Sequence, residues 1–348
     1  MQRFPAKNRI AIVVNPHTCR GKMAALWRAT RERLEQDEIV LAEIETKGDG
    51  HNPSRIGKLI ADTRPDLVVA AGGDGTVREV VQGLMSGAAR GRAAIAIVPL
   101  GTANNFARHV GLFSCRHAGR SAAEIALSAI HAREERAIDL GAVDAHYFVG
   151  SFALGMDADI LRMRNEYTAR FAGSRFVRGY PLYLWSCGVN LLTRKHGTRA
   201  HLSADGNQII THAYNLLVTN TSLYAGEFRF GSMESGEDGS LDLHLFAGPL
   251  SYFAGFAGAW RRHLRHRPGS TLRTPRKAMH VRSLAVRLDA PIEAQIDGEQ
   301  MDAIEECTIA VVPRALRVRV PPAPSALAWS EVEETRPRAQ QWASAAAH

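Results

Sequence analysis

The stretch DLVVAAGGDGT, residues 66–76, decides the fold that we expect for this chain. A short, wholly apolar run stands directly before a turn with three glycines, and a helical pattern over 77–85 follows the turn. Short apolar strands that alternate with helices are typical of a parallel sheet covered on both faces. Such sheets bind ligands beyond the carboxyl ends of their strands. The stretch therefore predicts an α/β domain with a binding site at Gly72–Thr76.

The same alternation extends to both sides of this stretch and then stops. The patterns predict strands at 9–15, 39–45, 66–71 and 94–98, and helices at 22–36, 53–63, 77–85 and 121–131. After about Ala137, strands at 143–150, 213–220, 241–246, 284–288, 293–296, 308–312 and 316–320 follow without regular helices between them. Two helical and basic inserts, roughly 159–196 and 251–266, interrupt this second part.

We therefore expect two domains with the active site in the cleft between them. An α/β domain covers 1–136, with 313–322 as a candidate segment that rejoins it. A mostly antiparallel, β-sandwich-like domain covers 137–312. Residues 323–348 are rich in Ala, Pro and Ser, which is typical of a disordered tail.

Charge and composition restrict the partners. The chain has 348 residues and a net charge of +8, and residues 243–288 contain no Asp or Glu but nine Arg and Lys residues. Such a balance suits an anionic lipid surface, a nucleic acid or a phosphate-rich ligand. Four scattered cysteines favour reduced thiols in the cytoplasm. The uncharged run 245–260 is too short and too broken by glycines to span a bilayer, so we expect the protein to meet a membrane from outside.

The glycine turn has the chemistry of a phosphate site. Its glycines let the backbone approach phosphate oxygens, and the helix that begins near Thr76 offers unpaired N–H groups. Asp74 inside the turn could hold Mg²⁺ beside the phosphates, with Glu79 one helical turn further on. The alternative is an ordinary glycine-rich turn in which Asp74 makes local hydrogen bonds.

Two further segments end strands of the same sheet. PLGTANNFAR, residues 99–108, follows the strand at 94–98, and Asn15-Pro16 ends the first strand, with Gly21-Lys22 just beyond. A Walker A loop is absent, because Pro16 stands where its first glycine would be and neither Ser nor Thr follows Lys22. The pattern predicts a nucleotide site of neither common type.

These three segments, in this order and spacing, resemble the catalytic domain of the diacylglycerol kinase family, particularly its soluble bacterial lipid kinases. The chain is similar to sphingosine and ceramide kinases more distantly. The resemblance covers Arg9 to Val320 and implies a kinase of phospholipid biosynthesis. It further implies ATP as phosphoryl donor, Mg²⁺, and a membrane lipid alcohol as acceptor, foremost diacylglycerol, which would give phosphatidic acid.

The resemblance also implies roles for individual residues. It assigns ATP binding to Asn15, Pro16, Gly21, Thr46, Gly72, Gly73, Asp74, Gly75, Thr76, Glu79, Gly101, Thr102 and Asn104, with Asn105 completing the cleft. The chain departs from the family in NPHTCRGK, residues 15–22, which carries His17, Cys19 and Arg20 in place of a small residue and an earlier glycine. It departs again at Asn105, where an Asp is commoner.

In the second domain the resemblance points to two short sequences. SGEDGSLD, residues 235–242, is similar to a loop that binds a structural Mg²⁺ through the Asp238 side chain and the carbonyls of Ser235 and Ser240. IDGE, residues 296–299, is similar to the segment whose Glu299 is the general base. Asp139 would face the cleft and assist at the metal, or it is a structural hinge residue. Read alone, the first two sequences are hairpin turns.

Aromatic residues precede both basic stretches of the second half. Tyr252, Phe253, Phe256 and Trp260 stand before the arginines at 261–267, and a similar group spans 180–185. They are either domain core or a contact with lipid. We expect a membrane lipid substrate and peripheral attachment to the anionic inner face of the membrane. The pattern does not favour a nucleic acid, and it leaves a homodimer open.

Two alternatives remain. GGDGT alone also occurs in NAD kinases, which act on a soluble acceptor; residues 99–108 and the acid-free basic stretch speak against this reading. A protein that keeps the fold, binds a membrane or a nucleic acid, and has lost catalysis is the second alternative. The presence of both Asp74 and Glu299 speaks against it.

Overall fold

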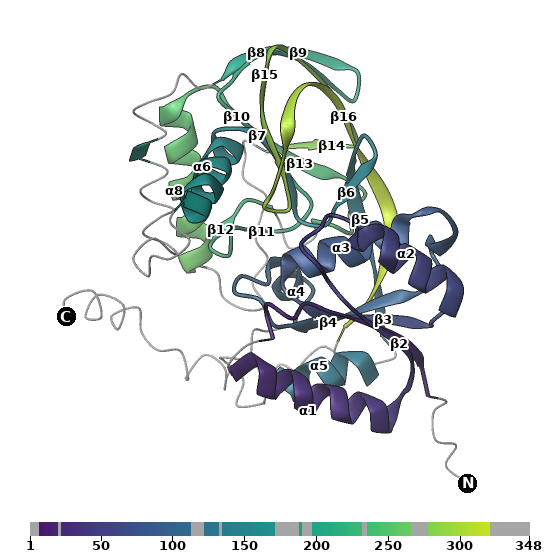
Figure 1. Ribbon diagram of the computed structural model, residues 1–348. Coiled ribbons are helices and arrows are strands. Elements are labelled where there is room, and N and C mark those ends of the chain that lie inside the picture. The colour runs from purple at the N-terminus through teal and green to yellow at the C-terminus, as the bar shows by residue number, and fades with distance from the viewer. Residues whose placement is uncertain are drawn as a thin grey trace, which may run out of the picture.

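The computed structural model describes residues 7–19, 22–112, 122–131, 134–170, 188–189, 197–231, 235–265 and 278–320. Its first part is a parallel sheet between helices, and its second part is mostly antiparallel β structure (Figure 1). The sequence predicted this fold class, and the structure confirms it. Gly21 and the predicted tail at 323–348 lie outside the described residues.

The first sheet is parallel throughout. It contains β1 (Arg9–Val14), β2 (Ile39–Glu45), β3 (Leu67–Gly72) and β4 (Ala94–Pro99), in the spatial order β4-β3-β1-β2. Every residue of β3 and β4 is buried, because both faces of these strands are covered. The wholly apolar runs in the sequence follow from this double burial.

Helices cover the two faces of this sheet (Figure 1). The helices are α1 (Lys22–Asp37), α2 (Asn52–Thr63), α3 (Asp74–Met85) and α5 (Ala122–His131), with the short η1 (Gly87–Ala89) and α4 (Asn105–His109). Ile56 and Val80 of α2 and α3 pack on the face that presents Val68. Trp27 of α1 and Ile130 of α5 pack on the opposite face. Alternate residues of each strand thus pack into two separate hydrophobic cores, one on each face of the sheet.

The second domain is built from antiparallel strands and two long helices. Its main strands are β5 (Glu135–Val143), β6 (His146–Phe148), β7 (Ser151–Gly155), β8 (Thr198–Ala204), β9 (Asn207–Ala213), β10 (Asn215–Thr219), β13 (Leu241–Phe246), β14 (Met279–Val281), β15 (Ser283–Ile296) and β16 (Glu299–Arg319). A two-stranded ribbon contains β11 (Leu223–Tyr224) and β12 (Phe228–Arg229). The helices α6 (Met156–Arg170) and α8 (Pro249–Arg265) lie side by side on the outer side of this domain (Figure 1).

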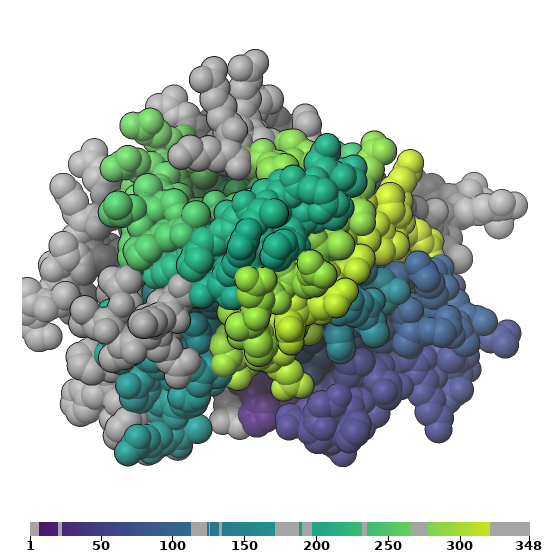
Figure 2. Space-filling view, turned by 90° about the horizontal axis from the view of Figure 1, so that it is seen from above, coloured from purple at the N-terminus to yellow at the C-terminus, as the bar shows by residue number. Residues whose placement is uncertain are grey.

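The strand β16 joins the two domains. Its first half pairs with β15, its second half pairs with β5, and Val318 near its end pairs in parallel with Ile95 of β4. Figure 2 shows the yellow-green strands β15 and β16 between the teal strands of the second domain and the blue first domain. The chain therefore enters the second domain through β5 and leaves it through the neighbouring β16.

Several predicted boundaries in the second domain are wrong. A single strand over 143–150 does not form, because a turn at 144–145 separates the end of β5 from β6, and a bend at 149–150 follows β6. The separate strands at 284–288 and 293–296 are one long strand, β15, and those at 308–312 and 316–320 both belong to β16. The pairing of β16 with β5 shifts between Val312 and Leu316, where Arg314 has a positive φ of 50°.

The bounds of the predicted helical inserts also differ from those in the structure. The insert predicted from 159 begins as α6 at Met156, and β8 follows from Thr198; the rest lies largely outside the described residues. Sequence reasoning assigned no element to residues 197–212 and therefore missed β8 and most of β9. Among the described residues, no helix is both long and apolar enough to cross a membrane.

Candidate active site

The carboxyl ends of the parallel strands bring the predicted nucleotide residues to one edge. Asn15 follows β1 and its N–H donates to the Ala71 carbonyl over 3.0 Å. Thr46 follows β2 and its N–H donates to the Val14 carbonyl over 2.9 Å. The turn after β3 and the loop after β4 lie beside them. The structure thus places the four segments together, as the parallel topology requires.

The two glycine loops touch one another. A Cβ atom built on Gly101 would lie 2.5 Å from the Cα of Gly73. A Cβ atom on Gly72 would lie 2.2 Å from the Thr76 hydroxyl oxygen. A side chain on Gly101 would collide with the Gly73 backbone, and one on Gly72 would collide with the Thr76 side chain, so both positions require glycine. The two loops are therefore closely packed at this edge of the sheet.

Asp74 fastens the second loop to the first. Its Oδ2 accepts the Asn105 N–H over 3.0 Å, and its Oδ1 accepts the Phe106 N–H over 3.1 Å. These donors are the first two residues of α4, so Asp74 supplies the N-terminal cap of that helix. Burial raises the pKa of Asp74, while the two N–H groups and the nearby Arg108 oppose the rise. The carboxylate therefore positions the loop, whatever else it binds.

Asn104 shapes the loop after β4 from within. It has a positive φ of 49° and is buried. Its Oδ1 accepts the Gly101 N–H over 3.1 Å, and its Nδ2 donates to the Gly101 carbonyl over 2.7 Å. Thr102, also a predicted ATP residue, is exposed between these two positions. The tight loop turns Thr102 outward and keeps Asn104 inside.

Glu79 is held one turn into α3. Asn52, at the start of α2, donates to its Oε1 over 2.8 Å and also bonds the backbone of Lys47 in both directions. Burial raises the pKa of Glu79 most, and the neighbouring Glu299 carboxylate adds to the rise. Sequence reasoning missed Asn52, since the only signal was a polar residue before Pro53.

Glu299 reaches this edge from the second domain. A Cβ atom on Gly75 would lie 3.4 Å from the Glu299 Oε1. Glu299 is the first residue of β16, directly after a turn in which Asp297 and Gly298 have φ values of 49° and 81°. Two successive positive φ values define the tight hairpin turn that an Asp-Gly pair favours. The hairpin thereby places a carboxylate from one domain against the phosphate loop of the other.

Asp297 anchors that hairpin. Its carboxylate accepts the N–H groups of Val149, Gly150 and Ser151 over 2.9, 2.7 and 2.8 Å. These residues form the turn that leads into β7. Asp297 therefore joins two turns and fixes the direction of Glu299 without turning toward the first domain.

Gln295 braces the same hairpin from inside. Its Oε1 accepts the Gly298 N–H over 2.8 Å, and its Nε2 donates to the Tyr224 hydroxyl over 3.2 Å. The Tyr224 hydroxyl donates in turn to Asp157 at the start of α6. Nothing in the sequence around Gln295 distinguishes it from an ordinary strand residue. Its role appears only because β15 leads directly into the turn.

Asp157 is a buried carboxylate at the centre of a polar cluster. Tyr252 of α8 donates to its Oδ1 over 2.6 Å, and Asn215 of β10 donates to its Oδ2 over 3.0 Å. Burial raises the pKa of Asp157 to about 6 against these hydrogen bonds. The cluster connects α6, α8 and β10 beneath the aromatic rings of the second domain.

Two hydrogen bonds hold the domains together beside the phosphate loops. The Gly226 N–H donates to Asn105 Oδ1, and Arg108 Nη1 donates to the Gly226 carbonyl, each over 2.7 Å. Asn105, which we expected to complete the cleft, therefore bonds Asp74 with its backbone and the second domain with its side chain. The loop after β11 thus lies against α4.

Asp139 lies at the junction of β5, β16 and the loop after 235. Its Oδ2 accepts the Gly239 N–H over 2.7 Å, its Oδ1 accepts the Arg314 N–H over 2.6 Å, and it is fully buried. Both carboxylate oxygens are thus bonded to backbone of the second domain. This geometry favours the structural alternative over a direct place in the cleft.

The predicted metal loop is exposed at Asp238 and buried at Ser235. Asp238 Oδ1 accepts both the N–H and the hydroxyl of Ser240 over 3.0 Å. Ser235 instead donates its hydroxyl to the buried Asp242 over 2.8 Å. In the part of the chain that the structure describes, no three His, Cys, Asp or Glu side chains gather as a metal site. A cation here would depend on Asp238 and backbone carbonyls, which are oxygen donors that suit Mg²⁺.

The first loop is described only in part. Asn15 Oδ1 accepts the His17 N–H over 2.9 Å, which turns the chain just after Pro16. Gly21 and Arg20 lie outside the described residues, so their predicted contacts with ATP stay predictions.

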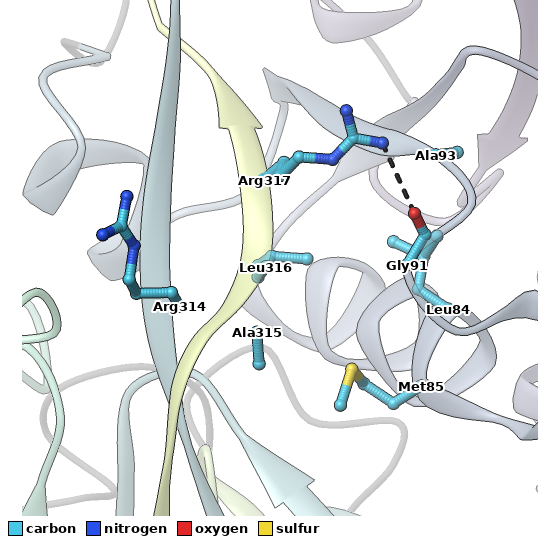
Figure 3. Close-up of a pocket in the computed structure, with 8 residues that line it drawn as sticks. All are labelled: Leu84, Met85, Gly91, Ala93, Arg314, Ala315, Leu316 and Arg317. Atoms are coloured by element: carbon cyan, nitrogen blue, oxygen red, sulfur yellow. Dashed lines mark hydrogen bonds between the residues drawn. The ribbon is translucent and has the colours of Figure 1, made fainter. Parts of the chain in front are cut away.

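A hollow elsewhere on the molecule is not this site. It is lined by Leu84, Met85, Gly91, Ala93 and residues 314–317, and Figure 3 shows these side chains around the end of β16. Arg317 closes one side by donating to the Gly91 carbonyl over 3.5 Å. Met85 ends α3, about 16 Å along the helix from Asp74 at its start. The hollow therefore opens at the opposite end of α3 from the glycine turn.

Comparisons with known proteins agree with this geometry. Residues 9–143 match the family model of the diacylglycerol kinase catalytic domain. The chain is 28% identical over 254 residues to a Pseudomonas aeruginosa (strain UCBPP-PA14) protein named "Probable lipid kinase YegS-like", over 73% of this chain and 76% of that protein. It is 29% identical over 180 residues to the diacylglycerol kinase of Bacillus subtilis (strain 168), over 52% of this chain and 54% of that enzyme.

A solved structure shows the same fold over both domains. The crystal structure of a diacylglycerol kinase from Bacillus anthracis str. Sterne superposes with a TM-score of 0.68 at 20% identity, and covers 91% of this chain and 98% of that one. The family match spans β1 to β5 and includes both glycine loops. Residues 9–143 are therefore similar to the diacylglycerol kinase catalytic domain, and the two relatives described above are named as a probable lipid kinase and a diacylglycerol kinase.

Proposed function

We propose that this protein transfers the γ-phosphate of ATP to a hydroxyl group of a membrane lipid, foremost diacylglycerol. The contact between Glu299 and Gly75 carries the proposal, because it brings a carboxylate of the second domain to the phosphate loop of the first. A phosphoryl transfer needs a donor site and an acceptor-side base within reach of one another. The hairpin at Asp297–Glu299 supplies such a base, Glu299, next to the donor site.

The donor side is the edge formed by Gly72–Thr76 and Gly101–Asn104. The phosphates of ATP would lie against the N–H groups at the start of α3, a 12-residue helix whose positive dipole end faces them. Asp74 and Glu79 of α3 offer carboxylate oxygens of the kind that Mg²⁺ takes as ligands, and the phosphates of ATP would supply others. Bound with ATP, the ion would neutralise charge on the phosphate oxygens.

On the acceptor side, Glu299 would take the proton of the attacking hydroxyl. The lipid oxygen forms its bond to the γ-phosphorus, and the bond from that phosphorus to the bridging oxygen of ADP breaks. The proton moves to a Glu299 carboxylate oxygen, and ADP leaves with the bridging oxygen. Gln295 and Asp297 hold the turn that aims this carboxylate.

Two elements would act at a distance from the reaction, namely the loop at 235–240 and Asp139. We place a structural Mg²⁺ at Asp238, with backbone carbonyls of Ser235 and Ser240, where it would order the loop bonded to Asp139. Asp139 is then a positioning residue that joins this loop to β16. The peripheral, cytoplasmic location and the place in phospholipid biosynthesis follow from a membrane lipid as acceptor.

Transfer from radiolabelled ATP to a panel of acceptors tests the proposal. The panel contains diacylglycerol, monoacylglycerol, sphingosine, ceramide and phosphatidylglycerol, with NAD as the soluble alternative. We expect labelled phosphatidic acid as the main product and a requirement for added Mg²⁺. Label in NAD alone would identify an NAD kinase-like enzyme instead. Label in no acceptor would identify a homologue that keeps the fold without catalysis.

A further inference from the structure

The helix α8 uses only one side for the domain core. Tyr252, Phe256 and Ala259 are buried and pack with Phe230 and Phe246 into an aromatic cluster. The Tyr252 and Phe256 rings have their centroids 4.5 Å apart, and the Phe230 and Phe256 rings 4.9 Å apart. The sequence left open whether these aromatic residues are core or lipid contacts. The structure divides them, because Phe253 and Trp260 of the same helix point elsewhere.

The neighbouring side of α8 exposes large apolar side chains. Leu250 is 88% exposed, Phe253 44%, Trp260 47% and Leu264 57%. At 3.6 residues per turn these four positions fall within an arc of about 80° on the helix surface. Among the described residues seven large apolar side chains are exposed, and four of them form this one stripe. Single exposed apolar residues are ordinary, but a contiguous stripe marks a contact surface.

Positive charge adjoins the stripe. Arg261 and Arg265 are exposed, and their positions follow the stripe directly around the helix. The helix contains no Asp or Glu, and neither does the whole stretch from 243 to 288. A surface with aromatic and aliphatic side chains beside arginines is complementary to the boundary between lipid headgroups and acyl chains when the headgroups are anionic. A docking protein would need acidic groups placed to match, whereas an anionic leaflet is negative everywhere.

The stripe is also well connected to the candidate active site. The Phe256 ring of α8 contacts the Tyr224 ring, with centroids 6.0 Å apart. Two residues further on, Gly226 bonds to Asn105 and Arg108 beside the phosphate loop. In Figure 1, α8 lies on the outer side of the second domain, away from the parallel sheet. A surface held by the exposed side of α8 would therefore lie against the domain that supplies Glu299.

We propose that the exposed stripe of α8, formed by Leu250, Phe253, Trp260 and Leu264 with Arg261 and Arg265, docks the protein on an anionic lipid surface. This inference rests on the proposed function, since docking would bring a lipid kinase to its substrate. The apolar side chains enter the headgroup boundary, and the two arginines stay at the headgroups.

Co-sedimentation of the full chain with vesicles tests the docking. Phosphatidylcholine vesicles with and without phosphatidylglycerol are compared at two salt concentrations. We expect the unaltered protein to bind the anionic vesicles, and to bind them more weakly in high salt. The variant Leu250→Ser/Trp260→Ser should bind at least about 10-fold more weakly than the unaltered protein. The variant Arg261→Glu/Arg265→Glu should lose the preference for phosphatidylglycerol. Ile210→Ser on β9 removes an equally exposed apolar side chain elsewhere and should change nothing.

Three outcomes overturn the docking. The first is binding of both double variants as strong as that of the unaltered protein, and the second is equal binding to neutral and anionic vesicles. The third is a dimer that light scattering finds for the unaltered protein and not for Leu250→Ser/Trp260→Ser, together with unchanged vesicle binding. That result would assign the stripe to a contact between two copies of this chain.

A soluble acceptor separates this inference from the proposed function. Short-chain diacylglycerol dispersed without vesicles should be phosphorylated equally by the unaltered protein and by Leu250→Ser/Trp260→Ser. Long-chain diacylglycerol in anionic vesicles should be phosphorylated about 10-fold more slowly by the variant. Vesicle binding without transfer to any lipid would sink the proposed function and leave the docking. Transfer with undiminished vesicle binding of both variants would sink the docking and leave the function.

Discussion

Both domains place a carboxylate at the candidate site with a glycine turn, but they do so by different means. In the first domain, Asp74 stands between a buried strand and a helix, and backbone N–H groups of the neighbouring loop hold it. In the second domain, Glu299 follows an Asp-Gly hairpin that side chains hold, namely Gln295 and Asp297. A parallel sheet fixes its site by topology. An antiparallel sheet has no such edge, so its contribution depends on individual side chains.

This difference predicts different responses to substitution. In the first domain the site is built into the backbone, so the loss of its central carboxylate should disrupt the donor side as a whole. In the second domain the site is one aimed side chain with braces behind it. Substitutions there should lower turnover in graded steps and leave the donor side intact.

The largest effect is expected from Asp74→Asn. Asparagine has one acceptor oxygen, so its NH₂ group would face the N–H of Asn105 or Phe106, and the negative charge is lost. We expect transfer from labelled ATP to fall by at least about 10³-fold, with the circular dichroism spectrum unchanged. Asp205→Asn is the matched control, because Asp205 also accepts two backbone N–H groups, those of Arg282 and Ser283, in the second domain. Near-normal turnover of Asp74→Asn would remove this residue from the mechanism.

Glu299→Gln should have the next largest effect. Glutamine keeps the shape but cannot accept the proton of the lipid hydroxyl. We expect kcat to fall by about 10²-fold, while the KM for ATP stays unchanged because the base acts on the acceptor. Glu305→Gln, at an exposed position further along β16, serves as control. If kcat on the best lipid is unaltered, Glu299 is only a turn residue at the rim.

Gln295→Leu should lower kcat by about 10-fold, because the hairpin that aims Glu299 loses its inner brace. A residue that acts through Glu299 has little left to disturb once the carboxylate is gone. In the Glu299→Gln background the same substitution should therefore cost much less than in the unaltered protein. Gln300→Leu, on the facing strand, is the control. Independent, multiplying effects would show that Gln295 does not work through Glu299.

Asp238→Ala should lower activity by only about 5-fold, since the loop that it orders lies behind the site. The KM for ATP should hardly change, and limited proteolysis of the second domain should become faster. Asp302→Ala, an exposed carboxylate on β16, is the comparison. A collapse in ATP affinity with unchanged proteolysis would contradict a structural metal at Asp238.

Asp157→Asn should affect stability and its pH dependence more than turnover. Burial in the folded protein raises the pKa of Asp157 to about 6 from its ordinary value of 3.8, so the carboxyl holds its proton more tightly when folded. Its contribution to stability is therefore full below the unfolded pKa and is lost as pH rises from about 4 to about 6, by up to about 3 kcal/mol. Melting temperatures at pH 4 and pH 7 measure this.

The comparison with the variant isolates this one group. Relative to Asp157→Asn, the unaltered protein should be more stable at pH 4 than at pH 7. Asn215 and Tyr252 keep hydrogen-bond partners in the variant, so it should fold. A stability difference that does not vary with pH would show that folding leaves the pKa of Asp157 unchanged.

The first domain could be predicted almost residue by residue. The strand at 39–45 has the limits that its β-branched pattern predicted, and the helix at 22–36 gained only Asp37. Both faces of the inner strands β3 and β4 are buried, so these two strands must be apolar along their whole length. That constraint leaves a strong signal in the sequence. The glycine loops could also be recognised in the sequence, because only glycine fits where Gly73 and Gly101 meet.

The second domain left weaker signals. Long strands such as β15 and β16 bend and change partners, so each looks like two short strands in the sequence. A turn at Asp144, with a positive φ of 49°, divided a predicted strand, because Asp tolerates the left-handed conformation that most residues avoid. Local patterns describe one strand at a time and cannot report which partner it pairs with.

The sequence by itself determined the α/β domain, the two glycine loops and the resemblance to diacylglycerol kinases, because glycine spacing and apolar strands are local properties. Only the tertiary structure decided that Asp74 caps α4, that Gln295 braces the hairpin, and that Glu299 lies against Gly75. It alone divided the aromatic residues of α8 between the core and an exposed stripe. The approach of Glu299 to Gly75 joins two distant parts of the chain and depends on how the strands pair, and no single stretch of sequence specifies that pairing.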